Sequence, residues 1–164
     1  MNKKAKDQIL KSQDNVRKIV ESDQCVYGIN TGFGPLCDTK ISADETARLQ
    51  YNLIISHAVG VGKPIDKELS KIMMIAKIHA LSKGFSGVSL EVIERMILML
   101  ENDIIPVVPE QGSVGASGDL APLAHLVLPL LGLGKVWDGE NTVDTAKILK
   151  KHKLKPLSLG PKEG

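Results

Sequence analysis

Ala116, Ser117 and Gly118 follow one another in the order from which a peptide can build an electrophile out of its own backbone. If the Gly118 nitrogen attacks the Ala116 carbonyl carbon, a five-membered ring closes around Ser117. Loss of two water molecules, one of them taking the Ser117 hydroxyl, then leaves a methylidene group on an imidazolone. Gly118 suits this reaction because it has no Cβ and tolerates unusual backbone angles. Protein side chains are ordinarily nucleophiles, whereas this ring would capture an amine.

These three residues lie in a longer glycine-rich stretch, residues 112–120, with the sequence GSVGASGDL. Such a stretch is also compatible with an ordinary loop that leads into a helix. The amide groups at a helix start would stabilise negative charge on an imidazolone, and the same geometry could bind a phosphate. The phosphate alternative lacks support, because neither a Gly-Lys-Ser/Thr sequence nor a Gly-x-Gly-x-x-Gly pattern is present.

A second glycine-rich stretch, residues 26–34, has the sequence VYGINTGFG and carries Tyr27. Its glycines, Gly28, Gly32 and Gly34, would let the backbone approach a ligand closely. A phenol can serve as a base only where its surroundings make it more acidic than usual. The alternative is a tyrosine that merely makes a hydrogen bond within its loop.

Both stretches resemble signatures of the aromatic amino-acid ammonia-lyases. Residues 112–125 resemble the segment that forms the methylidene-imidazolone in that family, and residues 26–34 resemble its tyrosine loop. The resemblance runs from about residue 10 to the end of the chain. It implies a cofactor, 4-methylidene-imidazole-5-one, that forms autocatalytically from residues 116–118 without a metal. It also implies an acid–base role for Tyr27 on the substrate.

Ser56 and His57 match two positions that meet the side chain of the substrate in this family. The resemblance associates Ser-His with histidine, an apolar pair such as Phe-Leu with phenylalanine, and His-Leu with tyrosine. An imidazole at His57 suits a hydrogen bond to a substrate imidazole, so we expect elimination of ammonia from L-histidine to give trans-urocanate. Lyases or aminomutases that act on tyrosine or phenylalanine are the alternatives. Gly34 and Leu120 match positions that line the substrate pocket.

The resemblance further implies that residues 1–164 are the N-terminal, cofactor-bearing part of a longer enzyme. Family members continue into central helices, which supply an arginine for the substrate carboxylate and assemble a homotetramer. We therefore expect a fragment that is inactive alone and that needs the missing helices or a companion chain. A non-catalytic remnant or an assembly subunit is the alternative from another class.

Composition favours no partner beyond a small-molecule substrate. The formal net charge is +2, so the electrostatic field of the protein is weak and does not indicate binding to a nucleic acid or an anionic membrane. Lysines recur within residues 147–155, a pattern more typical of a solvated helix face than of nucleic-acid binding. The most apolar run, residues 120–133, is interrupted by prolines and is too short for a membrane span. The chain opens without a signal-peptide pattern, so we expect a cytoplasmic protein.

The cysteines and histidines do not have the spacing of a metal site. Cys25 and Cys37 form no Cys-x-x-Cys pair, which predicts free, partly buried thiols. His79, His125 and His152 share no ligand spacing, and we interpret His79 and His125 as structural.

The remaining sequence predicts a mainly α fold, and it resembles the N-terminal helical domain of the fumarase/aspartase-like ammonia-lyases. Ser42 and Glu45 form a capping box, and Asp119 is placed to cap the helix after the glycine-rich stretch. A small β-hairpin is expected near residues 135–143. Apolar spacing, with glycines and prolines as stops, predicts helices over 4–22, 42–59, 66–82, 89–102, 120–131 and 144–152.

The helix over 66–82 carries apolar residues on one side that we expect to form its apolar face. They are Leu69, Ile72, Met73, Ala76 and Ala80.

Overall fold

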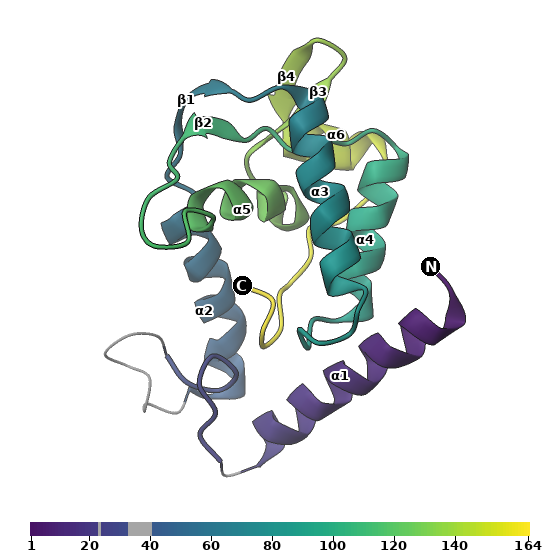
Figure 1. Cartoon of the computed structure of the whole chain (residues 1–164), viewed down its shortest axis with the longest axis vertical. Coiled ribbons are helices and arrows are strands. Elements are labelled where there is room, and N and C mark those ends of the chain that lie inside the picture. The colour runs from purple at the N-terminus through teal and green to yellow at the C-terminus, as the bar shows by residue number, and fades with distance from the viewer. Residues whose placement is uncertain (23, 33–40) are drawn as a thin grey trace. The chain divides into compact units, whose positions relative to one another are not determined.

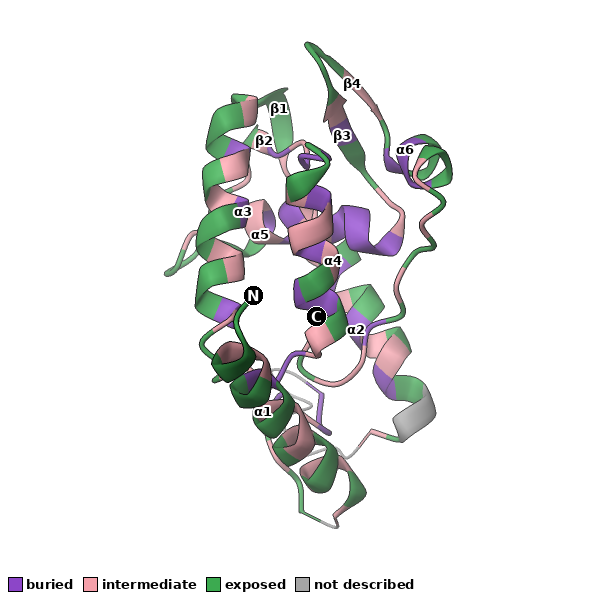
Figure 2. Ribbon diagram, turned by 90° about the vertical axis from the view of Figure 1, so that its right-hand side faces the viewer, coloured by how far each residue is buried: buried purple, intermediate pink, exposed green. Residues whose placement is uncertain are grey.

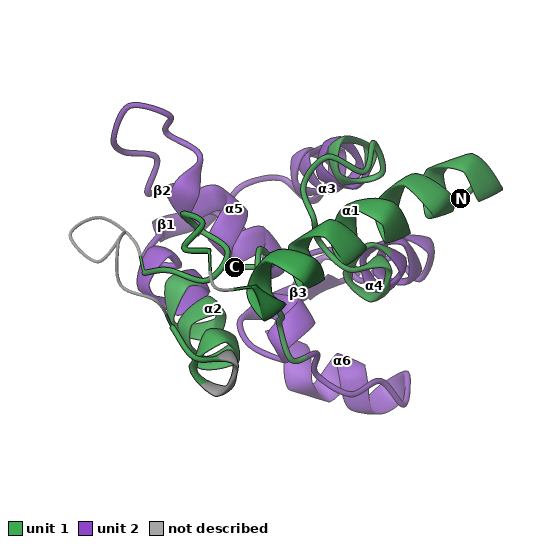
Figure 3. Ribbon diagram, turned by 90° about the horizontal axis from the view of Figure 1, so that it is seen from below, with its two compact units in different colours: residues 1–53, 79–93, 158–164 green, residues 54–78, 94–157 purple. Residues whose placement is uncertain are grey.

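The computed structural model describes residues 1–22, 24–32 and 41–164, and these form two compact units (Figure 3). Unit 1 comprises residues 1–53, 79–93 and 158–164, and unit 2 comprises residues 54–78 and 94–157. Gly34, predicted to line the substrate pocket, and Cys37, predicted to be a free thiol, lie outside the described residues. The prediction of a partly buried thiol is wrong for Cys25, which is exposed and lies outside regular structure between the first helix and the turn that carries Tyr27.

The mainly α prediction is confirmed, and the predicted helices are found to within a few residues of their expected ends (Figure 1). The helices are α1 Lys3–Glu21, α2 Ala43–His57, α3 Lys67–Leu81, α4 Leu90–Glu101, α5 Leu120–Val127 and α6 Thr145–Lys151, with a 3₁₀ turn, η2, at Leu128–Leu131. Gly84 after α3 and Gly132 after the turn that extends α5 have positive φ, which glycine adopts easily. By contrast, Asp103 and Lys153 take up this conformation after α4 and α6.

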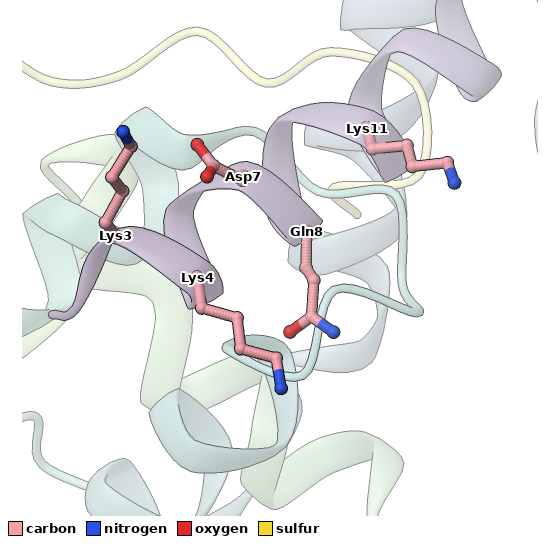
Figure 4. Close-up of a pocket in the computed structure, with 5 residues that line it drawn as sticks. All are labelled: Lys3, Lys4, Asp7, Gln8 and Lys11. Carbon is pink, nitrogen blue, oxygen red and sulfur yellow. The ribbon is translucent and has the colours of Figure 1, made fainter.

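Helix α1 in unit 1 is a mostly solvated helix with one buried contact. The Asn2 side chain caps it by accepting a hydrogen bond from the Ala5 N–H at 2.9 Å, and Ile9 is buried. Five of its residues line a surface pocket, and Figure 4 shows their side chains: Lys3, Lys4, Asp7, Gln8 and Lys11. None of these five is a predicted site residue.

The last residues of the chain are tied to the start of α4 within unit 1. The Glu163 carboxylate accepts hydrogen bonds from the Ser89 N–H at 2.7 Å and from the Gly160 N–H at 2.6 Å. The buried Gln50 side chain accepts from the Gly164 N–H at 2.7 Å. Charged acceptors make stronger hydrogen bonds than neutral ones, so Glu163 stabilises both backbone groups.

Unit 2 is built around a buried extended segment, residues 104–108, and the predicted hairpin. Strands β3 Lys135–Asp138 and β4 Asn141–Asp144 pair antiparallel, which confirms the hairpin. The Trp137 N–H donates to the Ile105 carbonyl at 2.8 Å, so the extended segment lies alongside β3. Buried residues of α4, α5 and η2 complete this core (Figure 2).

A second strand pair in unit 2 was not predicted from the sequence. Strand β1 Val61–Pro64 pairs antiparallel with β2 Pro109–Gln111, with Val61 opposite Gln111 (Figure 1). The pair is short and rich in glycine and proline, which are depleted in strands. It joins the segment after α2 to the segment before the glycine-rich loop.

Two further predictions about the helices are wrong. The Asp119 side chain makes no capping hydrogen bond, because its backbone is helical, whereas a capping residue is typically extended. The expected apolar face of α3 is mostly exposed, and Ser70, Met74 and Leu81 are its buried residues instead. Apolar residues surround α3 on several sides, so their spacing alone could not identify the side that packs.

Candidate functional site

The loop between β2 and α5, residues 112–119, presents Ala116 and Ser117 to solvent. Gly115 has φ of +83° and Gly118 has φ of +72°, so both occupy the left-handed region that favours glycine. The Ser113 hydroxyl donates a hydrogen bond to the Gly118 carbonyl, which closes the loop across its base. The three ring-forming residues therefore sit in a tight, closed turn.

This loop is compatible with the chemistry that Ala116-Ser117-Gly118 suggests. A Cβ added to Gly118 would lie 2.9 Å from the Ser113 hydroxyl oxygen, so any larger residue would both strain the backbone and disturb that contact. Because Ser117 is exposed, its hydroxyl can leave as water and an amine can reach the same carbon. The assignment of these residues as catalytic stays a prediction.

The start of the loop is anchored by a close approach of two backbones. A Cβ added to Gly112, whose φ is +149°, would lie 2.9 Å from the Gly60 Cα and 3.4 Å from the buried Ala121 Cβ. Only glycine permits that approach without displacing one of the two backbone segments. Together with the β1–β2 pair, it fixes the residues after α2 against the beginning of the loop.

Ser56 and His57 form the last turn of α2, directly before that anchor. The Ser56 hydroxyl oxygen lies 3.2 Å from Nδ1 of His57, and His57 is half-buried while Ser56 is exposed. The Val59 N–H donates to the His57 carbonyl at 2.9 Å, so the chain turns sharply toward Gly60. His57 is thus only three residues from a backbone position that touches the glycine-rich loop.

His125 on α5 contributes a contact that sequence reasoning missed. The Gly60 N–H donates a hydrogen bond to its Nε2 at 2.9 Å, across 65 residues of sequence. Burial lowers the pKa of His125 below the ordinary value of a histidine, which favours the neutral ring. Its position within the motif over 112–125 was the available signal, but nothing in the spacing indicated its partner.

Leu120, a predicted pocket residue, is exposed at the first turn of α5. It therefore follows the loop directly, and its side chain is available to a ligand. Unit 2 thus holds six predicted site residues, namely Ser56, His57, Ala116, Ser117, Gly118 and Leu120.

Tyr27 lies in unit 1, on a turn with a buried polar base. Its side chain is 62% exposed. The Asn30 side chain accepts from the Val26 N–H and donates to the Gln24 carbonyl, both at 2.8 Å, and the Thr31 hydroxyl accepts from the Gly28 N–H at 3.2 Å. Asn30 and Thr31 are the residues that shape this loop, although the sequence drew attention only to its tyrosine and glycines.

The rest of the described residues bear on three other kinds of feature: a metal site, a second surface depression and a membrane-spanning helix. No group of three or more His, Cys, Asp or Glu side chains that could hold a metal ion occurs among them. A second surface depression lies beside α6, between Gly132 and the segment 146–156, and no predicted site residue lines it. Within the described part of the chain, every helix is too short or too polar to cross a membrane.

Comparison with known proteins places these observations in a family context. A sequence model described as aromatic amino acid lyase matches residues 1–164. A histidine ammonia-lyase of Shouchella clausii is 49% identical over 158 residues, which cover 96% of this chain and 32% of that relative. The chain therefore spans about a third of the length of such relatives.

Solved structures of two different activities share this fold. A histidine ammonia-lyase from Trypanosoma cruzi matches with a TM-score of 0.88 and 35% identity, over 99% of this chain and 31% of that one. A tyrosine aminomutase from Streptomyces globisporus matches with a TM-score of 0.89 and 31% identity, over 99% and 30%. The shape of the backbone alone thus does not distinguish these activities.

Proposed function

Because this chain belongs to the aromatic amino acid lyase family, we propose that it is the cofactor-bearing, N-terminal part of a histidine ammonia-lyase. The complete enzyme would convert L-histidine to trans-urocanate and ammonia without an oxidant. The observation that carries the proposal is the exposed Ala116-Ser117-Gly118 turn, closed by Ser113 and anchored at Gly112. Self-cyclisation needs a turn of this kind, because the reacting atoms must be held together while water leaves.

The first step of the proposal is formation of 4-methylidene-imidazole-5-one. The Gly118 nitrogen forms a bond to the Ala116 carbonyl carbon. That carbonyl oxygen leaves as water with the amide hydrogens of Gly118 and Ser117, and a double bond forms between the same carbon and the Ser117 nitrogen. The Ser117 hydroxyl leaves as a second water with the hydrogen of the Ser117 Cα, which creates the methylidene. The balance needs no other reactant. The group supplies an electrophilic carbon that takes up the amine of the substrate.

Substrate choice is assigned to the pair that ends α2. The His57 imidazole would exchange a hydrogen bond with the substrate imidazole, and the contact with Ser56 orients its ring. Relatives named histidine ammonia-lyase at 43% to 49% identity support this choice. Leu120 and Gly34 would line the pocket, and Tyr27 would remove the β-proton of the substrate. A tyrosine or phenylalanine lyase or aminomutase would have an apolar residue in place of His57.

The proposal includes an assembly that completes the site. The remainder of the enzyme, as part of the same polypeptide or as a companion chain, would supply the group that binds the substrate carboxylate. The complete form would be a homotetramer in the cytoplasm. Residues 1–164 alone are then expected to show no turnover, since the substrate would not be held in a reactive geometry.

Intact mass spectrometry of the purified chain tests the proposal. The expected mass is lower than that of the sequence by two waters, and Ser117→Ala should remove the difference. Ser158→Ala, at an exposed serine outside the loop, is the control and should keep the mass loss. An unmodified mass in the unsubstituted chain would contradict ring formation here. Urocanate absorbance with excess histidine provides the second measurement, and clear turnover by residues 1–164 would contradict the proposed need for further parts.

A further inference from the structure

His125 and Gly60 make a hydrogen bond that links the two halves of the proposed site within unit 2. Gly60 lies three residues after His57, and His125 lies eight residues after Ser117 along the same chain. The Gly60 N–H points to Nε2 of His125 at 2.9 Å. This contact therefore joins the exit of α2, which carries the substrate-binding pair, to the helix that follows the ring-forming loop.

The direction of this hydrogen bond determines which nitrogen of the His125 imidazole carries a hydrogen. A backbone N–H can only donate, so Nε2 of His125 must be the acceptor and carries no hydrogen. The neutral ring then has its hydrogen on Nδ1, and protonation of Nε2 would turn the contact into a clash of two donors. Burial, which lowers the pKa of His125, favours the state that the geometry needs.

Gly60 is also enclosed sterically on the sides where it could move. A Cβ on Gly60 would lie 3.0 Å from the His125 Nε2 and 3.1 Å from the Pro109 Cγ. The Cβ position of Gly112 lies 2.9 Å from the Gly60 Cα. The imidazole of His125, the first residue of β2 and the start of the loop thus surround one backbone position. Loss of the ring would remove both a hydrogen-bond acceptor and one wall.

We propose that His125 is a positioning residue, whose neutral imidazole holds the Ser56-His57 segment at a fixed place relative to the loop that carries Ser117. In this role His125 contacts neither the substrate nor the imidazolone, and it acts through the Gly60 backbone. The role in catalysis rests on the proposed function, whereas the contact itself does not. Two matched variants separate the acceptor from the bulk of the side chain. His125→Gln places a carbonyl oxygen near the position of Nε2, and His125→Leu fills similar space without an acceptor.

Nitrogen-15 NMR of the purified chain tests the positioning directly, without need of ring formation. In the unsubstituted chain we expect an unprotonated Nε2 and a protonated Nδ1 for His125, with slow exchange of the Gly60 amide hydrogen. His125→Leu should shift the amide signals of residues 56–60 and 113–119, and His125→Gln should largely restore them. His79→Gln, at an exposed histidine on α3, is the control and should leave them unchanged.

A protonated Nε2 in the unsubstituted chain would overturn the proposal, whether or not the variants fold. Unchanged signals over residues 56–60 in a folded His125→Leu chain would overturn it as well. The rate at which the chain loses two waters is the functional readout, and we expect about tenfold slowing in His125→Leu with recovery in His125→Gln. If the unsubstituted chain loses no water, the proposed function fails while the NMR result still decides the role of His125.

Discussion

Replacement of Gly112 by alanine provides the sharpest test of how the loop is anchored. The new Cβ would meet the Gly60 Cα at 2.9 Å, a backbone atom that cannot rotate away as a flexible side chain could. Gly60 is itself held, because its N–H is bound to the His125 ring. Either β1 or the loop would therefore have to shift. Gly112 also has φ of +149°, at which a side chain is strained even where there is space.

These two effects give an expected loss of stability. A non-glycine residue in a rarely adopted backbone conformation costs roughly 1–3 kcal/mol. Overpacking against a neighbour that cannot move costs roughly 1–3 kcal/mol more. Gly115→Ala is the matched control, since Gly115 has φ of +83° but no atom within 4 Å of its Cβ position. It should carry only the first cost, so Gly112→Ala should be less stable than Gly115→Ala by about 1–3 kcal/mol.

Urea unfolding followed by tryptophan fluorescence measures this difference. The single tryptophan, Trp137, lies on β3 in unit 2, the same unit as both glycines, and therefore reports the relevant unfolding. Free energies of unfolding follow by linear extrapolation to zero urea. Equal destabilisation by Gly112→Ala and Gly115→Ala would refute the reasoning, because it would mean that Gly60 does not restrict space at Gly112.

Two further predictions concern charge and specificity. Lys67 and Lys71 donate hydrogen bonds to the Asp103 carboxylate and hold its pKa below the ordinary value. These contacts therefore stabilise the fold above about pH 4, and the stabilisation is lost as pH falls through the lowered pKa. Asp103→Asn should reduce the slope of the urea midpoint against pH in acid by a small amount, since the carboxylate is half exposed, and an unchanged slope would exclude this contribution. In a complete enzyme that carries this segment, His57→Leu should raise KM for histidine, because the loss of one hydrogen bond weakens binding by on the order of 1–3 kcal/mol. His79→Leu should leave this KM unchanged. Unchanged histidine kinetics in His57→Leu would exclude the role assigned to that side chain.

Local signals explain why most of the fold could be predicted from the sequence. The capping box is an example, since the Ser42 hydroxyl contacts the Glu45 carboxylate at 2.8 Å and receives the Glu45 N–H at 3.4 Å. The hairpin is another, because Gly139 with φ of +62° supplies the turn between β3 and β4. Such features depend on residues a few positions apart, and their chemistry is visible in the sequence.

The contacts that organise the site could not be predicted in the same way. The β1–β2 pair joins residues near 61 and 111, and neither strand has a local pattern that favours a strand. The partner of His125 depends on where the chain exit at Gly60 comes to lie, which no spacing within either motif expresses. The sequence therefore indicated which residues could react, while the structure was needed to find which residues hold them.

The reacting and the holding residues differ in their exposure, and this difference favours the catalytic interpretation over that of a plain loop. Ala116 and Ser117 are exposed, whereas Gly60, Gly112 and His125, which anchor the start of the loop, are half-buried. A self-made electrophile needs both properties at once, because an amine must reach it while its backbone stays bent enough to cyclise. A loop that only connected β2 to α5 would need neither a glycine-to-glycine approach at its base nor an acceptor ring on the helix behind it. That both occur around residues 112–125 is the physical reason to look for the ring in this chain.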